Sequence, residues 1–123
     1  MAFDNFPNPA ATERGTRVAL IFGLVTERLA VYYEHGQWLT QAQGASLAAD
    51  WLARSKRRLP LDERRRLSAL SDQLARQIAE SVSRETGLYI AHELRESLDP
   101  RYHSEIGQSI MKECEGLLDA ETG

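Results

Sequence analysis

Apolar residues recur every three to four positions along most of the chain, which is the spacing of one face of an α-helix. From Thr12 onward this pattern divides into five segments, separated by residues that commonly start or stop helices. We therefore expect an all-α fold, a compact bundle of about five helices, and an intertwined homodimer would satisfy the same pattern. Residues 1–11 are expected to form a flexible N-terminal arm, residues 12–119 a single helical domain and residues 120–123 an acidic tail.

The first segment, residues 12–34, is apolar on two sides. One stripe comprises Val18, Ile21, Phe22, Val25, Leu29, Tyr32 and Tyr33, and the opposite one Leu20, Leu24 and Val31. Only a narrow wedge around Gly23, Thr26 and Glu27 is expected to face water. Such a helix must be covered on both sides, either by a central place in the bundle or by a second copy of the chain. For the second case, the expected dimer interface consists of Leu20, Leu24, Val31 and Tyr32.

The other helices are delimited by capping and stop signals. Thr40 and Gln43 form a capping-box pattern, and the helix they open is expected to run to the Leu59–Pro60 break. The third helix is expected to start after Asp62 and to stop at Thr86 and Gly87. A fourth helix is expected over residues 88–98, and a fifth follows the Asp-Pro pair at 99–100.

A different interpretation of the N-terminal third gives an α+β fold. Residues 28–40 are rich in β-branched and aromatic side chains around Gly36, which is compatible with a β-hairpin, with residues 17–22 as a third strand. The helical interpretation is favoured because Glu27, Arg28 and Ala30 suit the flank of a helix and interrupt a strand.

Composition limits the class of protein. With 123 residues, 42% of them hydrophobic and 27% charged, the chain is expected to fold as one globular domain. Its single cysteine, Cys114, cannot form an internal disulfide, which favours a reducing, cytoplasmic location. We find no signal-peptide pattern and no apolar run long enough for a membrane span, so no membrane partner is expected.

The charges are distributed unevenly. Residues 1–53 carry a net charge of −2, residues 54–66 carry +5, and residues 67–123 carry −6. The positive segment contains seven basic residues: Arg54, Lys56, Arg57, Arg58, Arg64, Arg65 and Arg66. In the expected helix layout, the first four lie in the last turns of the second helix, where the helix dipole favours cations. The last three lie in the first turn of the third helix, where the dipole disfavours them.

Two functions follow from these cations. They could bind the phosphates of nucleic acid, with DNA favoured over RNA, and make the chain a small regulatory or accessory protein that is not an enzyme. Alternatively, the arginines could form salt bridges within the chain or between subunits, and the chain would be a helical protein–protein adaptor or structural subunit. The acidic overall balance, with a pI near 5.6, argues against a dedicated nucleic-acid-binding domain. The sequence favours nucleic acid only slightly.

No pattern points to catalysis, a metal or a cofactor. His92 and Glu96 lie one helical turn apart, but with the distant His103 they provide too few converging ligands for a metal site. Cys114 lies on an apolar stripe, with no histidine placed to activate it. We expect no catalytic residues, no metal and no cofactor, and we expect a homodimer and nucleic acid as partners, with a protein partner as the alternative.

Overall fold

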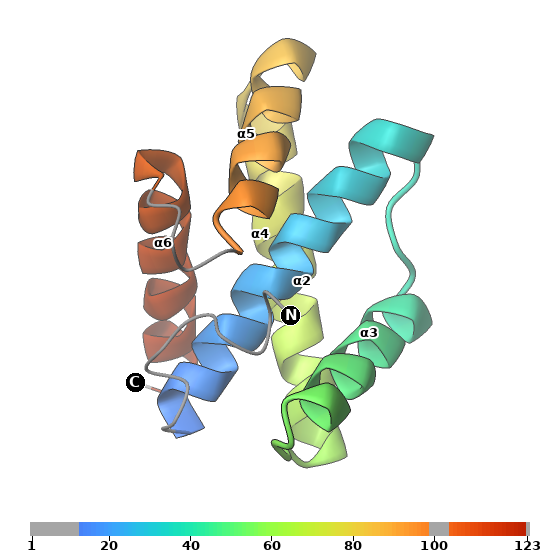
Figure 1. The fold of residues 1–123 in the computed structure, drawn as a ribbon, viewed down its shortest axis with the longest axis vertical. Coiled ribbons are helices and arrows are strands. Elements are labelled where there is room, and N and C mark those ends of the chain that lie inside the picture. Colours follow the sequence, from blue (N-terminus) through green and yellow to red (C-terminus); the bar gives the residue numbers. More distant parts are fainter. Residues whose placement is uncertain (1–12, 99–103, 123) are drawn as a thin grey trace.

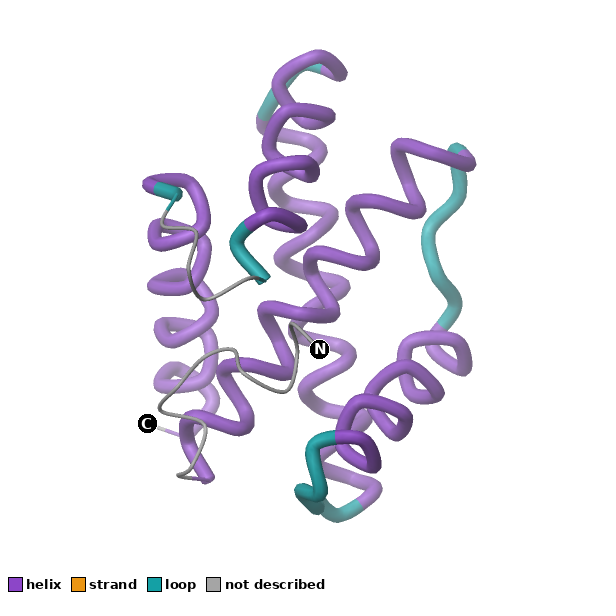
Figure 2. The backbone as a smooth tube through the Cα atoms, viewed as in Figure 1, coloured by secondary structure: helices purple, strands orange, loops and turns teal. Residues whose placement is uncertain are grey.

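The computed structural model describes residues 13–98 and 104–122, and it confirms the all-α prediction. Its helices are α2 (Glu13–His35), α3 (Gln41–Arg54), α4 (Leu61–Ser81), α5 (Arg84–Glu96) and α6 (Glu105–Thr122). Within the described residues every segment is helix or loop, so the alternative with an N-terminal hairpin is wrong (Figure 2). The expected flexible arm, residues 1–11, lies outside the described residues.

Helix α2 occupies the centre of the bundle. It contacts α3, α4, α5 and α6, and these four helices surround it (Figure 1). Most of both apolar stripes of α2 is therefore covered within one chain, and Val31 and Tyr32 remain partly exposed. The wedge expected to face water is buried at Gly23 and Thr26. Thr26 tolerates burial because its hydroxyl donates a 2.9 Å hydrogen bond to the carbonyl oxygen of Phe22 in its own helix.

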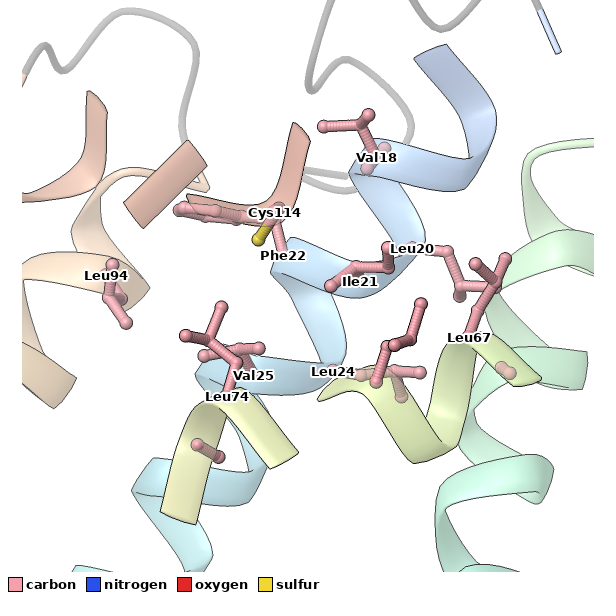
Figure 3. Packing of buried hydrophobic residues seen from close by; sticks show 14 of the residues in the cluster. Val18, Leu20, Ile21, Phe22, Leu24, Val25, Leu67, Leu74, Leu94 and Cys114 are labelled. Carbon is pink, nitrogen blue, oxygen red and sulfur yellow. The ribbon is translucent and has the colours of Figure 1, made fainter. Parts of the chain in front are cut away.

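The hydrophobic core forms where the other helices meet α2. Figure 3 shows Ile21, Phe22 and Val25 of α2 among side chains contributed by α4, α5 and α6. The surrounding residues labelled there include Leu67, Leu74, Leu94 and Cys114. These side chains are almost fully buried, as expected for the apolar face of each helix. No helix in the described residues is long and apolar enough to cross a membrane.

A fully buried arginine links α2 to α4. Arg28 was expected on the flank of its helix, but its side chain is 0% exposed. Its Nε donates to Ser71 Oγ at 3.0 Å, and its Nη2 donates to Ser68 Oγ at 2.8 Å. Its Nη1 donates to the Leu39 carbonyl oxygen at 3.2 Å and lies 3.3 Å from Asp72 Oδ1. Burial lowers the pKa of Arg28, and the Asp72 carboxylate partly offsets that shift. These contacts compensate the lost hydration, so the guanidinium can be buried.

Two predicted helix ends are confirmed. The Thr40 hydroxyl accepts a hydrogen bond from the Gln43 backbone N–H at 3.1 Å, and Gln43 Oε1 accepts one from the Thr40 N–H at 2.9 Å. This reciprocal pair is the capping box. Gly36 follows the end of α2 with φ at 74°, the left-handed conformation expected just after a helix.

The predicted boundary between the third and fourth helices is wrong. Helix α4 ends at Ser81, and Ser83 caps α5 by accepting a 3.3 Å hydrogen bond from the Thr86 backbone N–H. Gly87 was interpreted as a stop signal, yet it lies inside α5. A Cβ atom at this position would overlap the hydroxyl and ring of Tyr33. The glycine is therefore required by the close approach of α5 to α2 and not by a turn.

The last helix also ends later than expected. Helix α6 continues to Thr122, so three residues assigned to an acidic tail are helical. No proline or glycine occurs between Leu118 and Gly123, and the sequence therefore contains no strong stop before that point.

Candidate functional site

The basic segment forms the joint between α3 and α4, at the lower end of the molecule in Figure 1. Helix α3 ends at Arg54, so the prediction that it continues to Leu59 is wrong. The backbone N–H groups of Lys56 and Arg57 bond back to the carbonyl oxygens of Ala53 and Leu52, at 3.3 and 2.9 Å. This pair of bonds is the Schellman arrangement, which closes a helix.

Lys56 adopts the left-handed backbone conformation that this helix end requires. Its φ is 57°, and it is the non-glycine residue with positive φ in the described chain. A side chain in this conformation costs about 1–2 kcal/mol. The early helix end also means that Lys56, Arg57 and Arg58 lie on a loop. Their charges are therefore not explained by the dipole of α3, and that explanation holds for Arg54 alone.

Four of the seven cations surround one hollow. Lys56, Arg57 and Arg58 approach it from the loop, and Arg64 approaches it from the first turns of α4. The hollow has a volume of about 600 Å³. The remaining lining residues are apolar: Ala49, Leu52, Ala53 and Leu59. Within the described chain no acidic side chain lines this hollow.

Two of these cations contain nitrogen atoms without an acceptor. Arg57 Nη1 and Arg64 Nε are buried and make no hydrogen bond in the described part of the protein. The guanidinium carbon of Arg57 lies 5.8 Å from the centre of the Trp51 ring, a cation–π contact. Leaving a buried donor unsatisfied costs about 1–3 kcal/mol. Arg57 and Arg64 therefore carry hydrogen-bonding capacity that the described chain does not use, and side-chain rotation would be needed to turn these buried nitrogens toward the hollow.

The other three cations lie elsewhere. Arg54 Nε is 3.4 Å from the Asp50 carbonyl oxygen, on the side of α3 that faces a second hollow against α2. Arg65 is exposed. Arg66 is 3.5 Å from Glu63, whose carboxylate also accepts a 2.7 Å hydrogen bond from Arg17 of α2. The basic segment therefore does not form one continuous patch.

Glu63 connects α4 to α2 through the hydrogen bond from Arg17, whereas its pairing with Arg66 lies within α4. The hydrogen bond from Arg17 lowers the pKa of Glu63, so the carboxylate stays charged near neutral pH. Helix α4 starts at Leu61, two residues earlier than expected, and Arg65 and Arg66 consequently lie in its second turn. The helix dipole acts mainly within the first turn, so it disfavours these two cations less than the sequence suggested.

The four residues expected at a dimer interface divide into two pairs. Leu20 and Leu24 are 2% and 3% exposed, because they are already covered within the chain. Val31 and Tyr32 are partly exposed. The ring of Tyr32 stacks on Trp38 with centroids 4.1 Å apart, and Arg76 covers the Trp38 ring at 5.0 Å.

The candidate catalytic groups are either exposed or inert. His92 and Glu96 face solvent 3.9 Å apart, and His103 lies outside the described residues. Among the residues that the structure describes, no group of three or more His, Cys, Asp or Glu side chains could hold a metal ion. Burial raises the pKa of the Cys114 thiol to about 12, so this cysteine is protonated at neutral pH and unreactive.

The structure thus brings Lys56, Arg57, Arg58 and Arg64 around one hollow, and it places Arg66 beside Glu63. The arrangement can bind an anion, with an apolar wall that excludes water on one side. Comparison with protein-family models, with curated proteins and with solved structures found no match.

Proposed function

We propose that this protein binds nucleic acid without catalysing a reaction, through phosphate contacts at the joint between α3 and α4. Lys56, Arg57, Arg58 and Arg64 are the principal contacts, and Arg54 and Arg65 add positive charge at the edges. The observation that carries the proposal is the gathering of four cations around one hollow with no acidic side chain lining it. Phosphate contacts of this kind hold the backbone and give little base preference.

The rest of the molecule provides a contrast that supports this proposal. Where arginines have a structural role here, they pair with carboxylates: Arg14 with Asp119, Arg17 and Arg66 with Glu63, Arg28 and Arg76 with Asp72, and Arg95 with Glu34. None of the four cations at the hollow has such a partner in the described chain. Their positive charges repel each other, so an external anion would stabilise the site.

The salt dependence of binding tests the proposal. We would titrate the protein into labelled duplex DNA, single-stranded DNA and RNA of matched mixed sequence and measure fluorescence anisotropy at several salt concentrations. If each of the four cations contacts a different phosphate, the slope of log K against log salt should be near −3.6 for duplex DNA and near −2.8 for a single strand, from about 0.9 and 0.7 per phosphate. Between 50 and 200 mM salt, the duplex affinity should fall by roughly 100-fold.

Two double variants distinguish binding at the hollow from an effect of the net charge of the protein. Arg57→Gln with Arg64→Gln removes two cations from the hollow, and Arg14→Gln with Arg95→Gln removes two arginines that pair with Asp119 and Glu34 and do not line the hollow. Both variants lose the same net charge. The first should lower the magnitude of the duplex salt slope by about 1.8, and the second should leave it close to that of the parent. Equal losses of affinity in the two variants would show that only net charge matters, and circular dichroism would establish that both are folded.

The alternative function is a helical adaptor or structural subunit. A groove of about 340 Å³ lies between α4, α5 and α6, and its apolar lining favours this alternative. The lining includes Leu74, Ile78, Val82, Ile90 and Ile110. If the parent protein binds none of the nucleic acids in a salt-sensitive way, the nucleic-acid proposal fails and the adaptor takes its place.

A homodimer remains part of the proposal. Val31 and Tyr32 are the expected interface residues that stay partly exposed in the single chain. A two-fold dimer would present two of the basic hollows, and a strand that reached both would bind more tightly than the sum of separate contacts suggests. Light scattering at several protein concentrations tests this directly, and a constant monomer mass would exclude it.

A further inference from the structure

We infer that the hollow at the α3–α4 joint recognises a terminal phosphomonoester of a nucleic-acid strand in preference to an internal phosphodiester. This inference rests on the proposed function and specifies which phosphate the site takes. Its basis is the number of cations: Lys56, Arg57, Arg58 and Arg64 all line one space of about 600 Å³.

Charge balance favours a strand end. An internal phosphodiester brings one negative charge, whereas a terminal phosphomonoester carries about −1.5 to −2 near neutral pH and offers three strongly accepting oxygens. Four cations without a lining carboxylate are therefore compensated better by the terminal group. Access favours it as well, because the end of a strand can enter a concave site while an internal phosphate is flanked by chain on both sides.

Two buried donors next to the hollow can turn toward a ligand without breaking a hydrogen bond. Arg57 Nη1 and Arg64 Nε make no hydrogen bond within the described chain, so turning them toward a phosphate breaks none. For Arg57, the contact that would be lost is the cation–π contact with Trp51 at 5.8 Å. Arginine binds phosphate oxygens through paired N–H donors, which suits a group with several free oxygens.

Of the two acidic residues in the first turn of α4, Asp62 is exposed, and neither it nor Glu63 lines the hollow. Glu63 lies in the first turn of α4, one residue before Arg64, and it would repel a phosphate if its carboxylate faced the hollow. That carboxylate instead contacts Arg17 at 2.7 Å and Arg66 at 3.5 Å, and it does not line the hollow. The structural arginines thus hold the adjacent negative charge away from the site.

The apolar wall has a role in the same recognition. Leu52 and Leu59 line the hollow beside the cations, so one side of a bound phosphate would be shielded from water. Charge-assisted hydrogen bonds are stronger where water is excluded. The wall also leaves room for the sugar of the terminal nucleotide, and this part of the contact would not depend on the base.

The experiment compares single strands of one sequence that differ only at their ends. Internally labelled DNA and RNA strands would carry a 5′-phosphate, a 3′-phosphate or hydroxyl groups at both ends, and fluorescence anisotropy would give the affinity of the full chain for each. One further charge-assisted hydrogen-bonding group should make binding to a phosphorylated end roughly 10- to 100-fold tighter. The preference should vanish in the variant with Arg57→Gln and Arg64→Gln and persist in the variant with Arg14→Gln and Arg95→Gln.

The possible outcomes separate this inference from the proposed function. Equal affinity for phosphorylated and unphosphorylated ends, with salt-sensitive binding retained, would overturn the inference and leave the proposed function intact. Absence of salt-sensitive binding to every strand would overturn both. A free nucleoside 5′-monophosphate that competes as strongly as the phosphorylated strand would identify a free nucleotide as the ligand and would also overturn the preference for a strand end. Should a double variant fail to fold, Arg57→Lys and Arg64→Lys replace it, because lysine keeps the charge but removes the paired donors.

Discussion

Arg28 is the residue whose replacement should destabilise the fold most. Its guanidinium is fully buried and donates to Ser68, Ser71, Asp72 and the Leu39 carbonyl oxygen. Arg28→Ala would leave the Asp72 carboxylate and the two serines without this partner and would open a cavity between α2 and α4. Truncating a large buried side chain to alanine costs about 2–5 kcal/mol, and Asp72 would keep its ion pair with Arg76. A domain of this size has a free energy of unfolding of about 5–15 kcal/mol, so a large share would be lost.

Urea unfolding followed by circular dichroism measures the loss in free energy of unfolding, and two further variants provide values for comparison. Asp72→Asn keeps the shape and one acceptor but removes the charge, and we expect a loss of roughly 1–3 kcal/mol. Arg76→Ala removes an arginine that is 46% exposed and pairs with the same Asp72. The Arg76→Ala variant loses an exposed ion pair and a contact with the Trp38 ring, and together these should lower the free energy of unfolding by at most about 1–2 kcal/mol.

The order of the three losses is the decisive result. If Arg28→Ala is no more destabilising than Arg76→Ala, the buried guanidinium does not hold α2 against α4, and the energetic argument above is wrong. A lower m-value, which is the slope of the free energy of unfolding against urea concentration, would indicate a loss of cooperativity and would instead show that α3 or α4 detaches separately.

Three further predictions concern the backbone and the buried thiol. Because burial raises the pKa of Cys114 from 9.0 to about 12, the unfolded chain loses this proton in that pH range while the folded chain keeps it. The free energy of unfolding should therefore fall as the pH rises through this range, by up to about 1.4 kcal/mol per pH unit. Urea titrations of the Cys114→Ala variant at the same pH values should lack this part of the decrease. The same pH dependence of stability in parent and variant would contradict the prediction. Lys56→Gly should be more stable than Lys56→Ala by roughly 0.5–1 kcal/mol, because relief of about 1–2 kcal/mol of left-handed strain exceeds the added entropy of glycine, about 0.4–1 kcal/mol. Equal melting temperatures would show that Lys56 is not strained. Gly87→Ala should destabilise the protein by about 1–3 kcal/mol because the new Cβ atom would overlap Tyr33. Gly116 has open space around it, so Gly116→Ala should stabilise the protein by roughly 0.5–1 kcal/mol in the same thermal melts.

The sequence could predict the helices because their apolar spacing is a local signal. It could predict the start of α3 for the same reason, since Thr40 and Gln43 bond to each other across one turn. The end of α3 was not predictable in this way. Glycine usually occupies the left-handed position that closes a helix, and here Lys56 occupies it.

Arg28 was missed because charge and position gave opposite signals. It lies seven residues after Ile21 and three after Val25, so the apolar stripe of α2 places it toward the core, while its charge suggested solvent. The groups that make burial possible, Ser68 and Ser71, lie 40 and 43 residues further along the chain. A single sequence does not reveal that they meet Arg28.

The basic segment was recognisable from the sequence, but the sequence did not show which of its seven cations line the hollow and which lie elsewhere. Which cations share the hollow depends on the residue at which α3 ends and on the direction in which α4 leaves the loop. An end at Leu59 would have placed Lys56, Arg57 and Arg58 around a helix at 100° intervals. The observed end at Arg54 brings all three toward Arg64.

The central position of α2 determines how genetic data on this protein should be interpreted. Because every other described helix packs on α2, changes at its buried positions should lower the amount of folded protein and register as loss of function in a cellular selection. If the proposed function is correct, changes at the peripheral hollow should instead impair binding at normal abundance. A mutational scan that records protein level beside phenotype would distinguish the residues that maintain the protein from those that perform its task.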